Sequence, residues 1–228
     1  MNTEQRHHWN AQHKILSGII SLPDEHAKAV TLSLELHSAL YASEGRSAEQ
    51  TTLEDSLWDR LLESTLRSYP VRTPGSRNSI VWHLWHSARI EDITMNLLGA
   101  DREQVLHSEH YAERLQTPFI HSGNGMSEQD IAALSAEIDL GALAAYRCAV
   151  AGRTRCILSA LQPGQFTARA TPTQFRRVRE EQAVLETEQW LFDYWSGKTF
   201  AGHVLMPVTR HNFVHLTKAM RVKQKLQR

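Results

Sequence analysis

The sequence has no excess of charge of either sign. Its 228 residues include 25 Lys and Arg against 25 Asp and Glu, so the formal net charge is zero at pH 7. Non-specific nucleic-acid binding depends on a basic surface, and only the stretch KAMRVKQKLQR is locally basic. Because cations near a helix C-terminus suit the helix dipole, we expect a solvated helix end there and no nucleic-acid partner.

Cysteines and long apolar runs are also scarce. Cys148 and Cys156 lie eight residues apart in one expected helix, so they form neither a CxxC zinc motif nor a disulfide framework. We expect both to be reduced packing residues. No run approaches the length of a membrane span, and the polar start MNTEQRHHWNAQHK lacks the apolar core of a signal peptide. These absences predict a cytoplasmic protein with no membrane partner.

Two catalytic motifs are incomplete. The segment SGKTF contains GKT, but Phe192 stands where a phosphate-binding loop needs its first glycine. A ferritin-like di-iron site needs paired Glu-x-x-His units on core helices, and the clear instance, Glu4 to His7, lies in the polar start. We therefore expect neither a P-loop nor a di-iron centre.

Long segments of alternating apolar and polar residues, which would indicate a β-sheet, are missing as well. The chain has helical periodicity nearly throughout, and 41% apolar residues is an ordinary globular composition. We expect one domain over residues 1–228. Its predicted fold class is all-α, a four-helix bundle with additional helices.

Capping signals set the expected helix boundaries. Thr52 with Asp55 and Ser127 with Asp130 have capping-box spacing, and Asn78 or Ser79 can cap the helix that follows. The expected helices cover residues 4–20, 25–43, 52–66, 79–99, 138–161, 171–197 and 200–223, with one or two short helices within 101–115. Pro207 must either kink the last helix or start it afresh.

Histidine is abundant, with 13 residues, and two of them lie in the apolar segment WHLWHSARIED. At about 100° per residue, Trp82, Ile90 and Leu97 all fall within roughly 40° of His86. His86 therefore lies at the centre of an apolar stripe. A buried imidazole needs a hydrogen-bond partner or a metal ion to offset its lost hydration. For one such residue alone, a core histidine bonded to an ordinary acceptor is the simpler interpretation.

A second histidine pair lies near the C-terminus. TRHNFVHL places His211 and His215 at i and i+4, about 40° apart on one helix face, where both can reach a single ion. A solvent-facing pair is the alternative, because HxxxH lacks the central Glu of the zinc-protease motif. With a third imidazole from another helix, the pair would form a three-nitrogen site with open positions for water or substrate.

The two histidine segments together resemble the DinB/YfiT-like superfamily of helical metalloenzymes. The resemblance rests on SIVWHLWHSARIEDITMNLL and TRHNFVHL, and it extends through LELHSALYASE, GNGMSEQDIAALSAEIDLGALAAYR and LFDYWSGKTFAGHVLMP. It implies a four-helix bundle, often homodimeric, that binds a divalent metal through one histidine of the second core helix and two of the last. In this sequence those residues are His86, His211 and His215. The candidate metals are zinc, nickel and iron.

The resemblance says less about the reaction, because relatives range from thiol-dependent transferases and isomerases to proteins of no known activity. Three neutral imidazoles leave a bound ion its full double charge, which favours ionisation of a bound water or thiol. We expect a metal-dependent transferase that joins a low-molecular-weight thiol to a small electrophile. The alternatives are a metal-dependent hydrolase and a non-enzymatic metal- or ligand-binding stress protein.

Several polar residues near these motifs have open roles. We expect His83 to be a polar pocket wall, with a supporting or alternative ligand as the second interpretation, and His37 is a possible pocket residue. The polar residues that follow His86 favour a polar helix face, or supply a carboxylate that orients a ligand imidazole. These residues are Arg89, Glu91 and Asp92. Arg210 and Asn212 flank His211. For this pair we prefer capping or an exterior salt bridge to contact with an anionic substrate.

The tryptophans bear on association. Trp58, Trp190 and Trp195 exceed what one small core readily buries, so we expect an apolar patch that a second copy covers. Together with the family resemblance, this predicts a homodimer.

Overall fold

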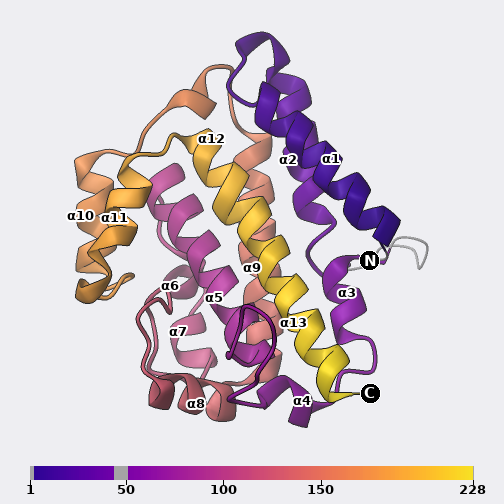
Figure 1. Cartoon of the computed structure of the whole chain (residues 1–228). Coiled ribbons are helices and arrows are strands. Elements are labelled where there is room, and N and C mark those ends of the chain that lie inside the picture. The colour runs from indigo at the N-terminus through magenta and orange to yellow at the C-terminus, as the bar shows by residue number, and fades with distance from the viewer. Residues whose placement is uncertain (1–2, 44–50, 228) are drawn as a thin grey trace.

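The part of the chain that the computed structural model describes, residues 3–43 and 51–227, is helical and contains no strand (Figure 1). Within these residues, Thr73 and Ser76 form one isolated antiparallel β-bridge. The all-α prediction is confirmed. Among the described helices, none is at once long and apolar enough to cross a membrane.

Helices of very different lengths alternate along the chain. The longer ones are α1 (Thr3–Ile19), α2 (His26–Ser38), α5 (Ile80–Asp92), α8 (Glu128–Glu137), α9 (Leu140–Ser159), α10 (Pro172–Glu180), α11 (Gln189–Ser196) and α13 (Asn212–Leu226). The short ones are α3 (Leu53–Trp58), α4 (Glu63–Arg67), α6 (Val105–Ser108), α7 (Tyr111–Arg114) and α12 (Phe200–His203). Single 3₁₀ turns are η1 (Pro23–Glu25), η3 (Gln165–Thr167) and η4 (Glu186–Glu188), and π-helical segments are η2 (Ile93–Gly99) and η5 (Val204–His211).

Side-chain caps determine where several helices begin. The Thr52 hydroxyl accepts the N–H of Asp55 at 3.1 Å, and the Asp55 carboxylate accepts the N–H of Thr52 at 3.0 Å. Ser127 and Asp130 make the same reciprocal pair at the start of α8. Both predicted capping boxes are therefore confirmed. Of the two residues proposed to cap α5, Ser79 does so, with its hydroxyl accepting an N–H of the first turn at 3.0 Å.

Two predicted helices are each divided in the structure. The segment 52–66 forms α3 and α4, because Arg60 has a left-handed φ of 51° and the Lys223 ammonium donates to the last carbonyls of α3. The segment 171–197 forms α10, η4 and α11, and Gln182 with φ of 50° separates the first two. Tertiary contacts and local backbone geometry thus end helices that the apolar pattern alone would continue.

Pro207 lies inside a helical run that continues from α12 through η5 into α13. Side chains of the next turn bond to backbone carbonyls of this segment. The Thr209 hydroxyl lies 2.9 Å from the Val204 carbonyl and 3.0 Å from that of Leu205, and the Asn212 amide donates to the Pro207 carbonyl at 3.1 Å. The last helix therefore does not start afresh at Pro207. The π segment takes up the irregularity that proline causes in a helix.

Helix α5 is the central element, and all of its residues are buried. It packs against α13, α9, α8 and α4, while α2 packs on α9 and η5, and α1 covers α2. Figure 1 shows α12 and α13 running diagonally beside α5, with α1 and α2 on one side and α10 and α11 on the other. Any polar side chain of α5 must therefore find its partners inside the protein.

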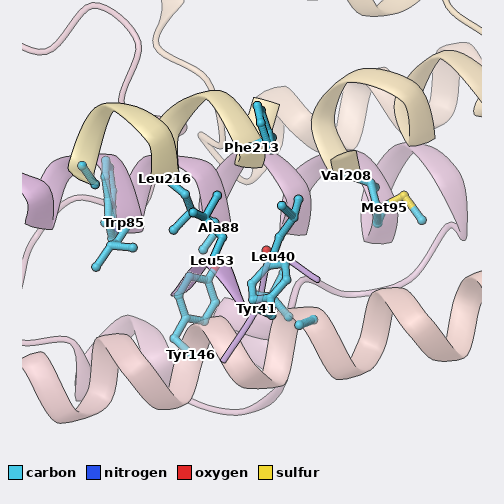
Figure 2. Close-up of a cluster of buried hydrophobic side chains, with 14 of the residues drawn as sticks. Leu40, Tyr41, Leu53, Trp85, Ala88, Met95, Tyr146, Val208, Phe213 and Leu216 are labelled. Atoms are coloured by element: carbon cyan, nitrogen blue, oxygen red, sulfur yellow. The ribbon is translucent and has the colours of Figure 1, made fainter. Parts of the chain in front are cut away.

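The main apolar core joins α5 to the helices around it. Figure 2 shows Trp85 and Ala88 of α5 near Phe213 and Leu216 of α13, with Tyr146 of α9 on the opposite side. A second, smaller cluster joins the C-terminal part of α5 and η2 to α10 and α11. The π-helical extension of α5 therefore buries Ile93, Leu97 and Leu98 in the second cluster, whereas its Met95 belongs to the main core.

The tryptophans and cysteines depart partly from expectation. Trp195, expected to remain for a partner, is buried in the second cluster, and Trp58 is half-buried with its indole N–H donating to Glu54. Trp190 alone of the three is exposed, at 53%. Of the cysteines, Cys148 is half-buried, whereas Cys156 is exposed, so the packing role expected for Cys156 is wrong.

Candidate metal centre

Three imidazoles meet where α5 contacts the C-terminal helices. His86 comes from α5, His211 ends η5, and His215 lies in the first turn of α13. Each offers one ring nitrogen, and these nitrogens lie within 4.8 Å of one another. The ring centroids are 4.3 Å apart for His211 and His215 and 4.8 Å apart for His86 and His215. The structure thus brings together the three residues that the sequence singled out.

The three imidazoles are neutral at pH 7. His86 and His215 are buried and His211 is half-buried. Burial, which disfavours the charged form, lowers the pKa of His86 to about 4. The pKa values of His211 and His215 lie well below the usual range for the same reason, and the neighbouring histidines lower them further. Neutral imidazole is the form that binds a metal ion.

A backbone carbonyl orients His86. Its Nδ1 lies 2.6 Å from the carbonyl oxygen of Ser122, so Nδ1 carries the proton and Nε2 carries the lone pair. The carbonyl can approach this closely because Gly123 follows it with φ of 87°, and a β-carbon there would stand 2.5 Å from the Trp85 ring. Trp82 stacks on the His86 ring at a centroid distance of 4.4 Å.

His83 lies against the cluster and is not a member of it. Its Nδ1 is 2.9 Å from Nδ1 of His215, and its Nε2 is 2.7 Å from the hydroxyl oxygen of Ser76. Burial lowers the pKa of His83 to about 3, with smaller contributions from Lys218 and His86. Because both ring nitrogens are engaged by side chains and the ring is 1% exposed, the expected pocket wall is in fact a buried partner of His215.

The donor set fits a divalent cation. The Nδ1 atom of His211 is buried and has no hydrogen-bond partner in the described part of the chain. An unpaired buried nitrogen is costly, and its presence beside two more imidazoles calls for an explanation. A metal ion accepting lone pairs from all three rings supplies one. Three nitrogen donors with no carboxylate suit zinc, nickel, iron or copper better than magnesium or calcium.

Lys218 adds positive charge beside the imidazoles. It follows His215 by three residues and His211 by seven, so it lies on the same face of the C-terminal helix. Its charge contributes to the lowered pKa of His83 and of all three clustered histidines. Its Cε lies beside Gly75, and within residues 3–43 and 51–227 no carboxylate forms an ion pair with it.

His37 belongs to a different buried network. Its Nε2 donates to the Glu91 carboxylate at 2.8 Å, and the same carboxylate accepts from the Tyr41 hydroxyl at 2.7 Å and the Asn212 amide at 2.6 Å. Burial alone would raise the pKa of Glu91, but the attraction of His37 and the hydrogen bonds from His37 and Tyr41 lower it overall. His37 therefore does not face the cluster through this nitrogen, and Glu91 does not orient a ligand imidazole.

The other polar residues of α5 are structural. The Asp92 carboxylate accepts from Arg89 at 3.1 Å, from the Tyr146 hydroxyl at 2.7 Å, and from the N–H groups of Val105 and Leu106. These bonds tie α5 to α9 and to the start of α6. Since Arg89, Glu91 and Asp92 are all 0% exposed, the expected polar helix face is wrong. These residues form buried networks.

Arg210, which neighbours His211 in sequence, points elsewhere. Its guanidinium donates to the Asn10 side chain at 2.7 Å and to His13 at 3.2 Å, and it lies over the Trp9 ring. Arg210 therefore links η5 to α1 through neutral side chains, and within the described residues it forms neither the cap nor the exterior salt bridge that was preferred for it. Asn212, on the other side of His211 in the sequence, donates to the Glu91 carboxylate.

Three contributors to the site have no clear signal in the sequence. Ser122 acts through its backbone carbonyl, which any residue type possesses. Ser76 lies in the loop PGS and approaches the site only through the fold. Lys218 is one of several cations in the basic C-terminal stretch, and only its spacing from His215 distinguishes it.

Comparisons with known proteins are consistent with the fold and silent on function. No family model matches the sequence, and no curated protein matches it. The crystal structure of a conserved protein from Enterococcus faecalis is similar in fold, with a TM-score of 0.54 and 15% identity over 86% of this chain and 94% of that one. At this identity the likeness shows the fold alone. The chain is an all-helical protein with a three-histidine cluster that can hold a metal ion.

Proposed function

We propose that this chain is a DinB-like protein that binds a divalent metal ion and acts as a metal-dependent thiol transferase on a small electrophile. The observation that carries the proposal is the convergence of His86, His211 and His215, all neutral, from two packed helical segments. We further propose that α2, α5, α9 and α13 form the four-helix bundle of that family. The packing of α5 on α13 and α9, and of α2 on α9, supports this arrangement.

The three imidazoles would hold zinc, nickel or iron through one nitrogen each. A divalent ion bound by neutral ligands keeps its full charge and therefore supplies a Lewis acid that holds sulfur as thiolate at neutral pH. The Ser122 carbonyl keeps the Nε2 lone pair of His86 available for such an ion. Three protein nitrogens fill only part of a four- or five-coordinate shell, which leaves space for a substrate.

The charge around the site favours an anionic substrate. The cluster contains no carboxylate, and Lys218 on the same helix face adds a further positive charge. Buried charge without a counter-charge is unfavourable. A thiolate supplies the missing negative charge. The stacked Trp82 ring provides an apolar wall beside His86 for the electrophile.

The test is conjugation of monochlorobimane by a panel of small thiols, including bacillithiol, mycothiol and glutathione. The sulfur forms a bond to carbon, chloride leaves, and the thiol proton goes to the buffer. Metal-loaded protein should outpace an equal amount of His211→Ala protein with at least one thiol. The double variant Cys148→Ala/Cys156→Ala should retain the rate, because the nucleophile is the added thiol and neither cysteine lies in the cluster.

Each other outcome selects a different function. If no thiol outpaces the metal-free protein while a panel of esters and amides shows metal-dependent turnover, the protein is a hydrolase. If both panels are silent, a non-enzymatic metal- or ligand-binding protein becomes the better account. Either result would overturn the transferase proposal.

A further inference from the structure

His83 and His215 face each other through their Nδ1 atoms, and a hydrogen bond between these two nitrogens needs one proton between them. Their Nδ1 atoms are 2.9 Å apart, a hydrogen-bond distance, and both rings are buried. A neutral imidazole, the form that binds a metal ion, carries one proton on one of its two ring nitrogens. One of the two Nδ1 atoms must therefore donate and the other accept.

The choice of donor decides whether His215 can bind a metal ion. If His83 donates, the only lone pair of His215 is taken by this bond, and the Nε2 of His215 carries a proton. If His215 donates from Nδ1, its Nε2 keeps a lone pair. Only the second arrangement leaves His215 with a free donor atom toward His86 and His211, with which it forms the cluster.

Ser76 can complete this second arrangement. When His83 accepts at Nδ1, its proton lies on Nε2, which is 2.7 Å from the Ser76 hydroxyl oxygen. That oxygen also accepts the N–H of Asn78 at 3.1 Å, which fixes its place. The Ser76 turn is held by the backbone hydrogen bonds between Thr73 and Ser76, and Gly75 adopts φ of 78° there.

We propose that His83 is a positioning residue that accepts the Nδ1 proton of His215 and so presents the Nε2 lone pair of His215 to a metal ion, with Ser76 holding His83. This inference rests on the proposed metal site. It gives His215 an orienting partner equivalent to the Ser122 carbonyl of His86. Partners of this kind typically change metal affinity by 10–100-fold when removed.

The first test compares Co²⁺ affinity in two matched variants of the full chain. His83→Leu replaces the imidazole with an apolar side chain of similar size and so removes the acceptor. His83→Gln puts an acceptor oxygen in its place. We expect His83→Leu to lower Co²⁺ affinity by about 10–100-fold and His83→Gln to recover most of the loss. His203→Leu is the control, because His203 is equally buried, has no hydrogen-bond partner for either nitrogen in the described residues, and lies outside the cluster.

The second test reads the tautomer in the metal-free protein. Long-range ¹H–¹⁵N correlation spectra of the imidazole rings distinguish Nδ1–H from Nε2–H. We expect the Nδ1–H form for His215 and the Nε2–H form for His83. Circular dichroism on heating establishes that each variant is folded before its affinity is interpreted.

The outcomes separate this inference from the proposed function. If the wild-type protein does not bind Co²⁺, the metal-site proposal fails, whereas the tautomers still report on the hydrogen bond. If wild-type protein binds and His83→Leu binds equally well, the positioning role is wrong. An Nε2–H tautomer of His215, or a His83→Gln variant that loses as much affinity as His83→Leu, would also overturn it.

Discussion

At the scale of single residues, buried neutral imidazoles make the stability of the folded protein depend on pH. Burial lowers the pKa of His203 to about 4, from about 6.5 for an exposed histidine. Between these two values the unfolded chain binds a proton that the folded chain does not. The free energy of unfolding therefore falls as the pH drops below about 6.5, and this residue makes no contribution to the dependence above that pH.

Replacing His203 should change this pH dependence. For metal-free protein, each such histidine lowers the free energy of unfolding by about 1.4 kcal/mol per pH unit within that window. His203→Leu should reduce the slope of the unfolding free energy against pH by the contribution of one histidine. It should change the unfolding free energy little at pH 7.5, because an apolar group replaces an unpaired buried imidazole. Urea unfolding at pH 7.5, 6.0 and 5.0 measures both. An unchanged slope would show that the pKa of His203 is the same in the folded and unfolded chains, which would contradict this account.

The site illustrates what residue-level reasoning can predict. Helical spacing placed His211 and His215 on one face and His86 at the centre of an apolar stripe, and both patterns depend only on local geometry. The Ser122 carbonyl and the contact between His83 and His215 depend on the fold, because the latter pair is separated by 132 residues. Such partners carry no local pattern, so the sequence gives no direct means of finding them.

At the scale of helices, the Glu91 network joins three elements. The carboxylate on α5 accepts from His37 of α2, from Tyr41 just beyond α2, and from Asn212 at the start of α13. All four side chains are buried. The network therefore fixes the position of the helix that carries His215 relative to the helix that carries His86.

Removing the shared acceptor should be costly. Glu91→Leu removes the acceptor that three buried donors share: Nε2 of His37 loses its partner and the Tyr41 hydroxyl keeps only a 3.4 Å contact to Asn212, whereas the Asn212 amide still donates to the Pro207 carbonyl. We expect the variant to lower the free energy of unfolding by about 3–5 kcal/mol, the usual effect of breaking a buried charged network. Urea unfolding at pH 7.5 measures the loss. The control is Glu137→Gln, which alters an exposed carboxylate at the end of α8 and should change the value by less than about 0.5 kcal/mol. Equal stability of the two variants would refute a structural role for the network.

A complementary change tests the separation of the two networks. His37→Gln keeps a donor toward Glu91, so we expect a modest loss of stability and an unchanged Co²⁺ affinity, since His37 bonds to Glu91 and not to the cluster. Calorimetric titration with Co²⁺ gives the affinity directly. A loss comparable with that of a cluster histidine would instead assign His37 to the metal site.

Helix boundaries show the same division between local and distant causes. The capping boxes at Thr52 and Ser127 were predictable, because donor and acceptor lie three residues apart. The end of α3 was not, because the Lys223 ammonium that satisfies its carbonyls comes from α13. In the π-helical passage around Pro207, likewise, the Thr209 and Asn212 side chains bond to backbone carbonyls of the segment.

At the scale of the whole molecule, we expect a homodimer on the strength of the family resemblance. Much of the tryptophan surface expected to remain for a partner is used within the chain, as for Trp195. Trp190 and Tyr194, four residues apart on α11, still expose 53% and 37% of their surface. Light scattering at micromolar concentration should give twice the chain mass of 26.0 kDa. A single-chain mass would reject the dimer.

The central claim is that His86, His211 and His215 together hold a divalent ion. Its most direct test is the metal content of protein purified without nickel resin, loaded with zinc, dialysed and analysed by mass spectrometry. We predict about one ion per chain for wild-type protein and for His203→Leu, and a sharp loss in each of the single variants His86→Ala, His211→Ala and His215→Ala, because each removes one of three protein ligands. Full occupancy after loss of either His211 or His215 would contradict the account.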